Sequence, residues 1–214
     1  MAVTFKAAVA VVTLAVAFAR SVAAGPIEDG LEVAERRDYT TAIRLWRTLA
    51  DQGDVDAQHN LGLMYERGHG VTQDHAVAVS WFRKAADQGF AAAQLSLGVM
   101  YENGLGVPQD FTTAVSWYRG AADQGNTAAQ LNLGVMYDNG WGVTQNHVIA
   151  HMWFSLAAAM GDRDAARNRD IAAAKLTPAE IAQTQRLIRE WEPNSTPRRM
   201  AARCARHAAE REEP

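Results

Sequence analysis

A string of 36 residues recurs three times in the middle of the chain, with its glycines and aromatic residues in step. The copies occupy residues 53–88, 89–124 and 125–160. A fixed period of this length is typical of proteins that stack small helical units, each burying its apolar face only against its neighbours. The positions shared by all three copies include Gln58, Gln94 and Gln130; Leu61, Leu97 and Leu133; Gly62, Gly98 and Gly134; Tyr65, Tyr101 and Tyr137; Trp81, Trp117 and Trp153.

Each copy predicts a pair of helices. In the middle copy the first helix is expected to run from about Phe90 to Asn103, with Gly104 as a left-handed cap at its end. Asp110 is placed to cap the start of the second helix, which should extend to about Gln124. Apolar residues at helical spacing predict the buried side of this second helix. They are Ala114, Trp117, Tyr118 and Ala121.

Glycine pairs at 68–70, 104–106 and 140–142 raise the question of phosphate binding. A phosphate loop normally follows a strand and opens directly into a helix. These turns follow a helix and end several residues before the next one. We therefore interpret the glycines as helix caps and tight turns.

The flanking segments resemble the repeats less closely. Residues 25–52 predict a divergent N-terminal capping helix pair, and residues 161–191 predict a C-terminal capping pair whose last helix starts at a Thr177–Glu180 capping box. Residues 192–214 are rich in charge and proline and predict a solvated tail. The whole pattern predicts an all-α, right-handed α-solenoid of antiparallel helix pairs with about ten helices.

The N-terminus has the three parts of a secretory signal: a basic start at Lys6, an apolar run at 7–19, and small residues up to Ala24. We predict a signal peptide at residues 1–24 that is cleaved before Gly25, so that the protein is exported and is periplasmic or secreted. An uncleaved anchor is the alternative, but the apolar run is shorter than the roughly 20 residues that span a bilayer. No later segment is long and apolar enough to do so.

Charge and cysteine content narrow the function. Without residues 1–24 the chain has 19 basic and 24 acidic residues and no basic stripe, which argues against nucleic acid as a partner. The single cysteine, Cys204, excludes an internal disulfide. It is an incidental residue of the tail, or else it forms a disulfide with a partner or acts as a reactive thiol. A monomer is favoured, although nothing in the sequence fixes the oligomeric state.

The repeated motif AQxxLGxMYxxGxGVxxDxxxAxxWxxxAAxxG resembles the Sel-one-like repeats, a subclass of the tetratricopeptide-like helical solenoids. It is matched at residues 57–89 and 93–125, and at 129–161 with Asn146 in place of the aspartate. The ending, with NRD at 168–170 and LTPAEIA at 176–182, also resembles exported bacterial members. The resemblance implies a scaffold that binds proteins or peptides. The paired cysteines of the branch linked to penicillin recognition are missing here.

In related tetratricopeptide geometry the first helix of each pair lines the concave surface. Residues of these helices that point away from the core-forming stripe are therefore candidates for partner binding. Leucine and valine form an apolar strip there, with amide and hydroxyl groups beside it, although the same residues could instead pack against the next helix. The candidates are His59, Asn60, Leu63, Arg67, Leu95, Ser96, Val99, Glu102, Asn103, Leu131, Asn132, Val135, Asp138, Asn139 and Trp141.

The sequence shows no catalytic motif and indicates no cofactor. His147 and His151 are four residues apart and could share a metal ion, but no third ligand is evident. The sequence thus favours a non-enzymatic adaptor or scaffold of the bacterial envelope that binds a protein or peptide, with a possible role in regulating signalling. The alternatives are an enzyme that acts on cell-wall material or β-lactams, and a purely structural role.

Overall fold

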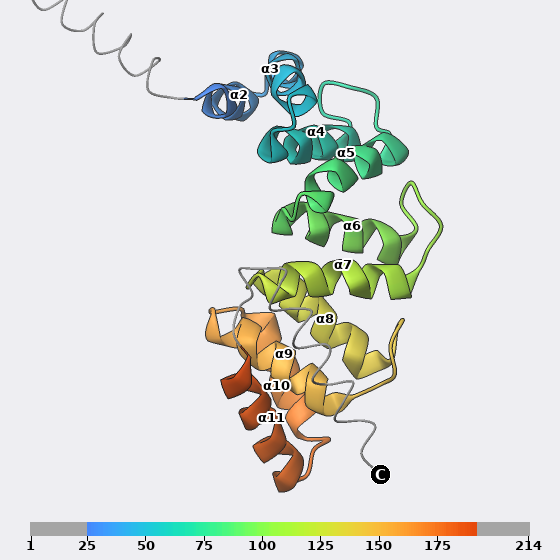
Figure 1. Ribbon diagram of the computed structural model, residues 1–214, viewed down its shortest axis with the longest axis vertical. Coiled ribbons are helices and arrows are strands. Elements are labelled where there is room, and N and C mark those ends of the chain that lie inside the picture. The colour runs from blue at the N-terminus through green and yellow to red at the C-terminus, as the bar shows by residue number, and fades with distance from the viewer. Residues whose placement is uncertain (1–24, 192–214) are drawn as a thin grey trace, which may run out of the picture. The chain divides into compact units, whose positions relative to one another are not determined.

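The computed structural model describes residues 25–191, which form ten α-helices and no strand (Figure 1). The predicted signal peptide, the charged tail and Cys204 lie outside the described residues. Internal contacts divide the described chain into two compact units, with the boundary between Ala85 and Ala86. The all-α solenoid of helix pairs expected from the sequence is confirmed.

The first unit contains α2 (Pro26–Glu35), α3 (Tyr39–Asp51), α4 (Val55–Arg67) and most of α5 (His75–Asp87). Its core is built around Trp46, Leu61, Met64 and Trp81, all of which are buried. Trp46 Nε1 donates to the carbonyl oxygen of Ile27 at 3.4 Å, and this contact connects α3 to α2 in the divergent first pair. Gly30 is buried against the same indole ring, where a Cβ atom would overlap with it.

The second unit contains two complete pairs and a closing pair. The pairs are α6 (Ala91–Asn103) with α7 (Phe111–Asp123), and α8 (Thr127–Asn139) with α9 (His147–Ala159). The closing helices α10 (Arg163–Ala173) and α11 (Pro178–Glu190) both pack on α9. Buried Thr184 donates its hydroxyl to the carbonyl oxygen of Val148 at 3.4 Å, which connects α11 to α9.

Helix ends follow the predicted chemistry. Gly104 adopts φ 68° and ψ 32° at the end of α6, a conformation that is costly for residues with a Cβ. The Asp110 carboxylate accepts from the backbone N–H groups of Thr112 and Thr113 at 2.9 and 3.1 Å. The capping box of Thr177 and Glu180 is present at the start of α11. These caps fix the helix boundaries to within one or two residues of those expected.

Close packing within a pair depends on a glycine in its first helix. Gly98 faces the ring of Tyr118, and a Cβ at position 98 would overlap with the ring edge. Gly62 faces Phe82 and Gly134 faces Phe154 in the same way. Because the missing side chain lets an aromatic ring lie against the backbone, the two helices of each pair can approach closely.

Successive pairs are joined by a repeated glutamine. Gln58 Nε2 donates to the carbonyl oxygen of Ala50 at 3.1 Å, and Gln130 Nε2 donates to that of Ala122 at 3.2 Å. In both cases the acceptor is eight residues earlier, at the end of the preceding helix. Each carbonyl oxygen also accepts from a backbone N–H, that of Gly53 at 3.1 Å for Ala50 and that of Gly125 at 2.9 Å for Ala122, so the glutamine uses its second acceptor site to connect one pair to the next.

One expectation about the core was wrong. Trp117 is only half-buried, whereas its equivalents Trp81 and Trp153 are buried. Met100 and Met136 are fully buried and were not selected as core residues from the sequence. Unbranched methionine side chains fill irregular gaps in such cores.

Candidate partner-binding surface

The fifteen candidate residues fall on α4 in the first unit and on α6, α8 and the following turn in the second. His59, Asn60, Leu63 and Arg67 belong to the first group, and the other eleven belong to the second. The structure has no bound partner, so their role in binding stays a prediction. Their surroundings show which side chains are available and which are already engaged.

The apolar strip is half-buried. Leu95, Val99, Leu131 and Val135 each pack against the core of the second unit, and Leu63 packs against the core of the first. Packing of these residues, which the sequence allowed as an alternative, therefore accounts for part of their surface. We call the remaining exposed parts of the four residues of the second unit, on α6 and α8, the apolar line.

Two asparagines border this line and are exposed. Asn103 Nδ2 donates to the carbonyl oxygen of Val99 at 2.9 Å, and Asn139 Nδ2 donates to that of Val135 at 3.0 Å. An asparagine amide has a second N–H and a carbonyl oxygen with acceptor capacity. The hydrogen bond to its own helix thus orients each side chain and leaves groups that can contact a ligand.

Ser96 and Asn132 are less available. The Ser96 hydroxyl donates to the carbonyl oxygen of Ala92 at 3.1 Å, and its side chain is half-buried. The Asn132 side chain forms a hydrogen bond with Tyr118, the aromatic residue that packs on Gly98. Both side chains therefore serve the internal structure of the unit.

The Glu102 carboxylate accepts a hydrogen bond from the Tyr118 hydroxyl. Burial, the hydrogen bond to Glu102 and the charge of Glu102 together raise the pKa of Tyr118 far above its usual value. The tyrosine consequently stays neutral and acts as a hydrogen-bond donor to the Glu102 carboxylate. Phe82 and Phe154 occupy the equivalent position in the other repeats, so this contact is specific to the middle repeat.

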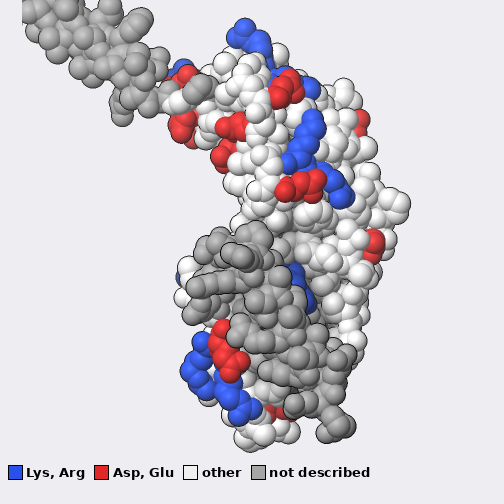
Figure 2. All heavy atoms as spheres, in the orientation of Figure 1, with Lys and Arg blue, Asp and Glu red and all other residues white. Residues whose placement is uncertain are grey.

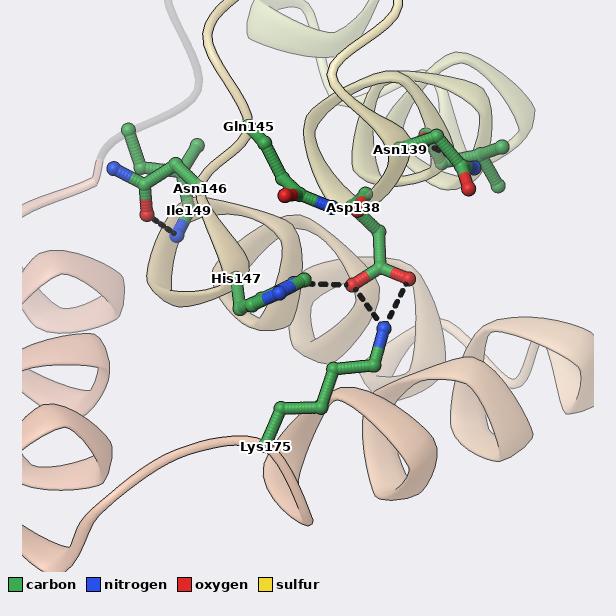
Figure 3. Close-up of polar contacts among 8 residues, drawn as sticks. Asp138, Asn139, Gln145, Asn146, His147, Ile149 and Lys175 are labelled. Atoms are coloured by element: carbon green, nitrogen blue, oxygen red, sulfur yellow. Dashed lines mark hydrogen bonds and ion pairs between the residues drawn. The ribbon is translucent and has the colours of Figure 1, made fainter.

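Asp138 is the centre of a polar cluster at the end of α8 (Figure 3). His147 Nδ1 lies 2.7 Å from Asp138 Oδ1, and Lys175 Nζ lies 3.0 and 2.8 Å from Oδ1 and Oδ2. The side chain of Asp138 is only 19% exposed, against 39% for Lys175. Three segments that are distant in sequence meet at this carboxylate: the end of α8, the start of α9 and the turn between α10 and α11.

The pKa of Asp138 lies below its usual value. Burial alone would raise it, but the hydrogen bonds from Lys175 and His147 and their charges outweigh that effect. The carboxylate is therefore ionised near neutral pH and partly shielded from ligands by Lys175. The candidate site at Asp138 is thus a preformed ion pair that a partner would have to share or displace.

Trp141 is among the most accessible apolar side chains of the second unit, with 43% of its surface exposed. Its ring stacks on Phe111, with the centroids 5.7 Å apart and the planes 23° from parallel. His69 stacks on Tyr39 in the same manner in the first unit. In both units, an aromatic residue in the turn within one helix pair stacks on the first residue of the second helix of the preceding pair. In the second unit the ring of Trp141 in this stack is exposed to solvent.

In the first unit His59 is half-buried and packs against Phe82, with ring centroids 5.5 Å apart. Burial, with a smaller contribution from the charge of Arg67, lowers the pKa of His59 to about 4. A neutral histidine packed on an aromatic ring is poorly suited to attract an anionic group. Arg67 is exposed, and Asn60 is half-buried.

The histidines considered for metal binding are not brought into a metal-ligand set. His147 is bonded to Asp138, and His151 is buried in α9 with no hydrogen-bond partner at Nδ1. Across residues 25–191 no group of three histidine, cysteine or acidic side chains has the geometry to hold a metal ion. Nor does any helix in that range have the length and apolarity that crossing a membrane requires.

Two contributors to this surface, Lys175 and Tyr118, were not selected from the sequence. Lys175 is 37 residues from Asp138 and lies outside the regular repeats, so the period gave no indication of the contact. Tyr118 was interpreted only as a core residue. The signal that was available is the replacement of phenylalanine by tyrosine at position 118, since a buried tyrosine hydroxyl usually requires a hydrogen-bond partner.

Comparison with known proteins identifies the family. The Sel1 repeat matches residues 25–54, 55–90, 91–126 and 127–162, which is more than half of the chain. The chain therefore belongs to the Sel1 repeat family, the Sel-one-like repeats that its motif resembled. Residues 25–54, which we interpreted as a divergent capping pair, are matched as a repeat of their own. Such proteins generally act through protein–protein interaction and are typically non-catalytic.

Two solved structures are similar to this chain. A Sel1 repeat protein from Oxalobacter formigenes is 35% identical with a TM-score of 0.64, and the alignment covers 67% of this chain and 59% of that one. The protein c5321, described as a protective antigen of uropathogenic Escherichia coli with an SLR fold, is 32% identical with a TM-score of 0.54 and coverage of 72% and 41%. The chain thus spans less than two thirds of either relative. No curated protein sequence gives a significant match.

Proposed function

We propose that this protein is a non-enzymatic adaptor of the bacterial envelope, which binds a protein or peptide partner through the first helices of its repeats. The observation that carries the proposal is the exposed edge of α6 and α8. Asn103 and Asn139 are exposed there and held by their own helices, and Trp141 presents an aromatic ring. Tryptophan is enriched among the residues that contribute most to binding, and hydrogen-bonding groups such as these amides typically surround it.

The predicted secretory signal supports a location in the envelope. The basic start, apolar run and small-residue exit of residues 1–24 are typical of a secretory signal. The absence of cysteine pairs is compatible with either side of the membrane, since the stacked helices supply the core. A fusion of the protein to a reporter that is active only after export tests this part of the proposal, and a reporter signal confined to the cytoplasm would reject it.

The binding face is tested by photo-crosslinking in cells. A photoreactive residue is placed at Asn139, which is exposed on α8, and in a matched control at Ser116, which is exposed on α7. We expect position 139 to capture a discrete partner that position 116 does not. Equal capture from both positions would reject this face. Exposed positions are preferable to Leu95 or Leu131, because a charge at those half-buried leucines would disturb the core as well as the surface.

A second variant separates binding from folding. Trp141→Ala removes the exposed ring without touching the buried core, so its helical content should be unchanged while partner capture falls. Hydrolysis assays with peptidoglycan and a β-lactam on the same purified protein address the enzymatic alternative. Turnover of either substrate would contradict the proposed adaptor function.

A further inference from the structure

The turn that joins α6 to α7 brings two carboxylates close to an exposed aromatic stack. Gln109 Nε2 donates to the carbonyl oxygen of Glu102 at 2.8 Å, and the Asp110 N–H donates to that of Tyr101 at 2.9 Å. These bonds hold the end of α6 beside the start of α7. Phe111 follows Asp110 directly and supports the ring of Trp141. We call Glu102, Asp110, Phe111 and Trp141 the turn patch.

Among the described residues, neither carboxylate of the turn patch forms an ion pair with lysine or arginine. Glu102 is bonded to the neutral hydroxyl of Tyr118, and Asp110 is bonded to the hydroxyl and backbone N–H of Thr113 and to the N–H of Thr112. These hydrogen bonds lower the pKa of Asp110. The Asp138 carboxylate differs, because Lys175 balances its charge. The uncompensated negative charge therefore lies at the turn patch.

The surrounding helices carry one positive side chain, Arg119 of α7. Neither α6 nor α8 contains lysine or arginine, and residues 89–160 contain four acidic side chains and only Arg119 as a basic one. Arg119 is bonded to the Tyr137 hydroxyl. On the face drawn in Figure 2, charged groups gather over α10 and α11, whereas the described surface of α6 and α7 is mostly uncharged.

Carboxylates beside a tryptophan ring form a surface suited to arginine. A guanidinium group can pair with the carboxylate through two N–H groups and can stack on an aromatic face, which a lysine ammonium does less well. The chain itself contains a segment of matching chemistry outside the described residues. Residues 198–206 read RRMAARCAR, with four arginines and no acidic residue.

The length of chain allows contact. The described chain ends at Trp191, whose ring packs against Trp153 of α9 in the second unit. Seven residues separate Trp191 from Arg198 and fifteen separate it from Arg206, distances that extended chain spans in about 23 and 50 Å. The second unit is built from helices of 11 to 13 residues, each no longer than about 20 Å. The turn patch begins on α7, which packs on α8, which packs on α9, and each packing step is about 10 Å. Two such steps plus a full helix length remain within about 50 Å, so the arginine segment can reach the turn patch.

We propose that residues 198–206 dock on the turn patch of the second unit, with arginines paired to Glu102 and Asp110 and stacked on Trp141. The docked segment would cover Glu102 and Trp141, which also belong to the candidate partner site, and would therefore compete with a partner. This competition rests on the proposed function, whereas the docking does not depend on it.

The single cysteine, Cys204, allows a spin label to be attached within the segment, so that docking can be measured by NMR. A nitroxide attached to Cys204 of the full-length chain broadens the amide resonances of residues near it, and no mutation is needed. Docking predicts strong loss of intensity at Asn103, Asp110 and Trp141, at one end of the helices. Gly125 and Asn126, at the opposite end of α7, should keep theirs, since the 13 residues of α7 span about 20 Å. The losses should disappear at 1 M salt, where the Debye length is about 3 Å.

Matched variants identify the charges. Arg203→Glu and Glu102→Gln should each restore the lost intensities, whereas Arg211→Glu, with the same charge change outside the segment, should not. Broadening that only declines with distance in sequence from residue 191 would overturn the proposal. So would broadening of an isotope-labelled chain by a separate spin-labelled chain, since that result assigns the contact to a second copy. Partner crosslinking at position 139 is a separate measurement, so the docking proposal can fail while the proposed partner binding stands.

Discussion

The ammonium group of Lys175 lies 2.8 Å from Oδ2 of Asp138 and connects the closing helices to the last complete pair. Asp138 was expected to face a partner, yet its carboxylate is engaged by a residue 37 positions later in the chain. The C-terminal pair thus does more than cover apolar surface. It also supplies a cation to the end of α8.

This contact should contribute modestly and in a salt-dependent way to stability. Lys175 is 39% exposed, so Lys175→Met is expected to lower the free energy of unfolding by about 0.5–1 kcal/mol at low salt, and by less at 1 M salt. Urea unfolding at the two salt concentrations measures the difference. Arg167→Met is the control, because its pair with Asp164 is more exposed, at 72% and 69%, and its loss should have no measurable effect. An equal effect of both substitutions would show that the ion pair between Asp138 and Lys175 does not contribute to stability in solution.

The glycine that faces an aromatic ring should be intolerant of a methyl group. In Gly98→Ala the new Cβ would overlap with the ring of Tyr118, and we expect a loss of about 1–3 kcal/mol. Gly120→Ala is the matched control in the other helix of the same pair. Its Cβ would meet only the flexible Gln94 amide, 3.0 Å away, and alanine favours the helix by roughly 0.5–1 kcal/mol. Urea unfolding of both variants distinguishes close packing from a general effect of substitution, and similar stabilities would contradict the packing argument.

The hydroxyl of Tyr118 should stabilise the middle repeat through Glu102. Tyr118→Phe restores the residue found at the equivalent positions 82 and 154, but it leaves a half-buried carboxylate without its donor. We expect a loss of about 1–2 kcal/mol. In a double-mutant cycle, Glu102→Gln should reduce the effect of Tyr118→Phe, because the charged acceptor is gone. Strictly additive effects would mean that the hydrogen bond contributes nothing.

His59 should make the first unit sensitive to acid. Its folded pKa is about 4, whereas an unfolded histidine titrates near 6.5. Between these values the unfolded chain binds a proton that the folded chain does not, so stability is complete above pH 6.5 and is lost as pH falls toward 4. The loss amounts to roughly 2–3 kcal/mol. His59→Gln should remove this part of the pH dependence, and an imidazole resonance of His59 that titrates near pH 6.5 would contradict the buried geometry.

Local features of the sequence were sufficient to predict the helices. Gly104 and Asp110 mark the end of one helix and the start of the next through chemistry within a few residues, and the structure has both caps as expected. Because the sequence repeats every 36 residues, the same helix boundaries can be assigned to the other pairs. The fold class follows from these two signals alone.

The candidate surface was less predictable, because its state depends on contacts between segments. Helical angles placed Val99 and Asp138 on the face that points away from the core stripe. They could not show that Val99 packs half-buried or that Lys175 neutralises Asp138. Trp117 was misjudged for a related reason: equivalent positions in a repeat have different neighbours, and burial follows the neighbours.

The hydrogen bonds of Gln58 and Gln130 have a consequence for how such chains change. Each amide donates to a backbone carbonyl oxygen, at Ala50 and Ala122, and this acceptor is present whatever side chain the preceding helix carries. Because the acceptor is a backbone atom, this contact between two pairs does not require any particular side chain in the preceding helix. Repeats joined in this way can be duplicated, lost or exchanged without the matching substitutions that a contact between two side chains would require.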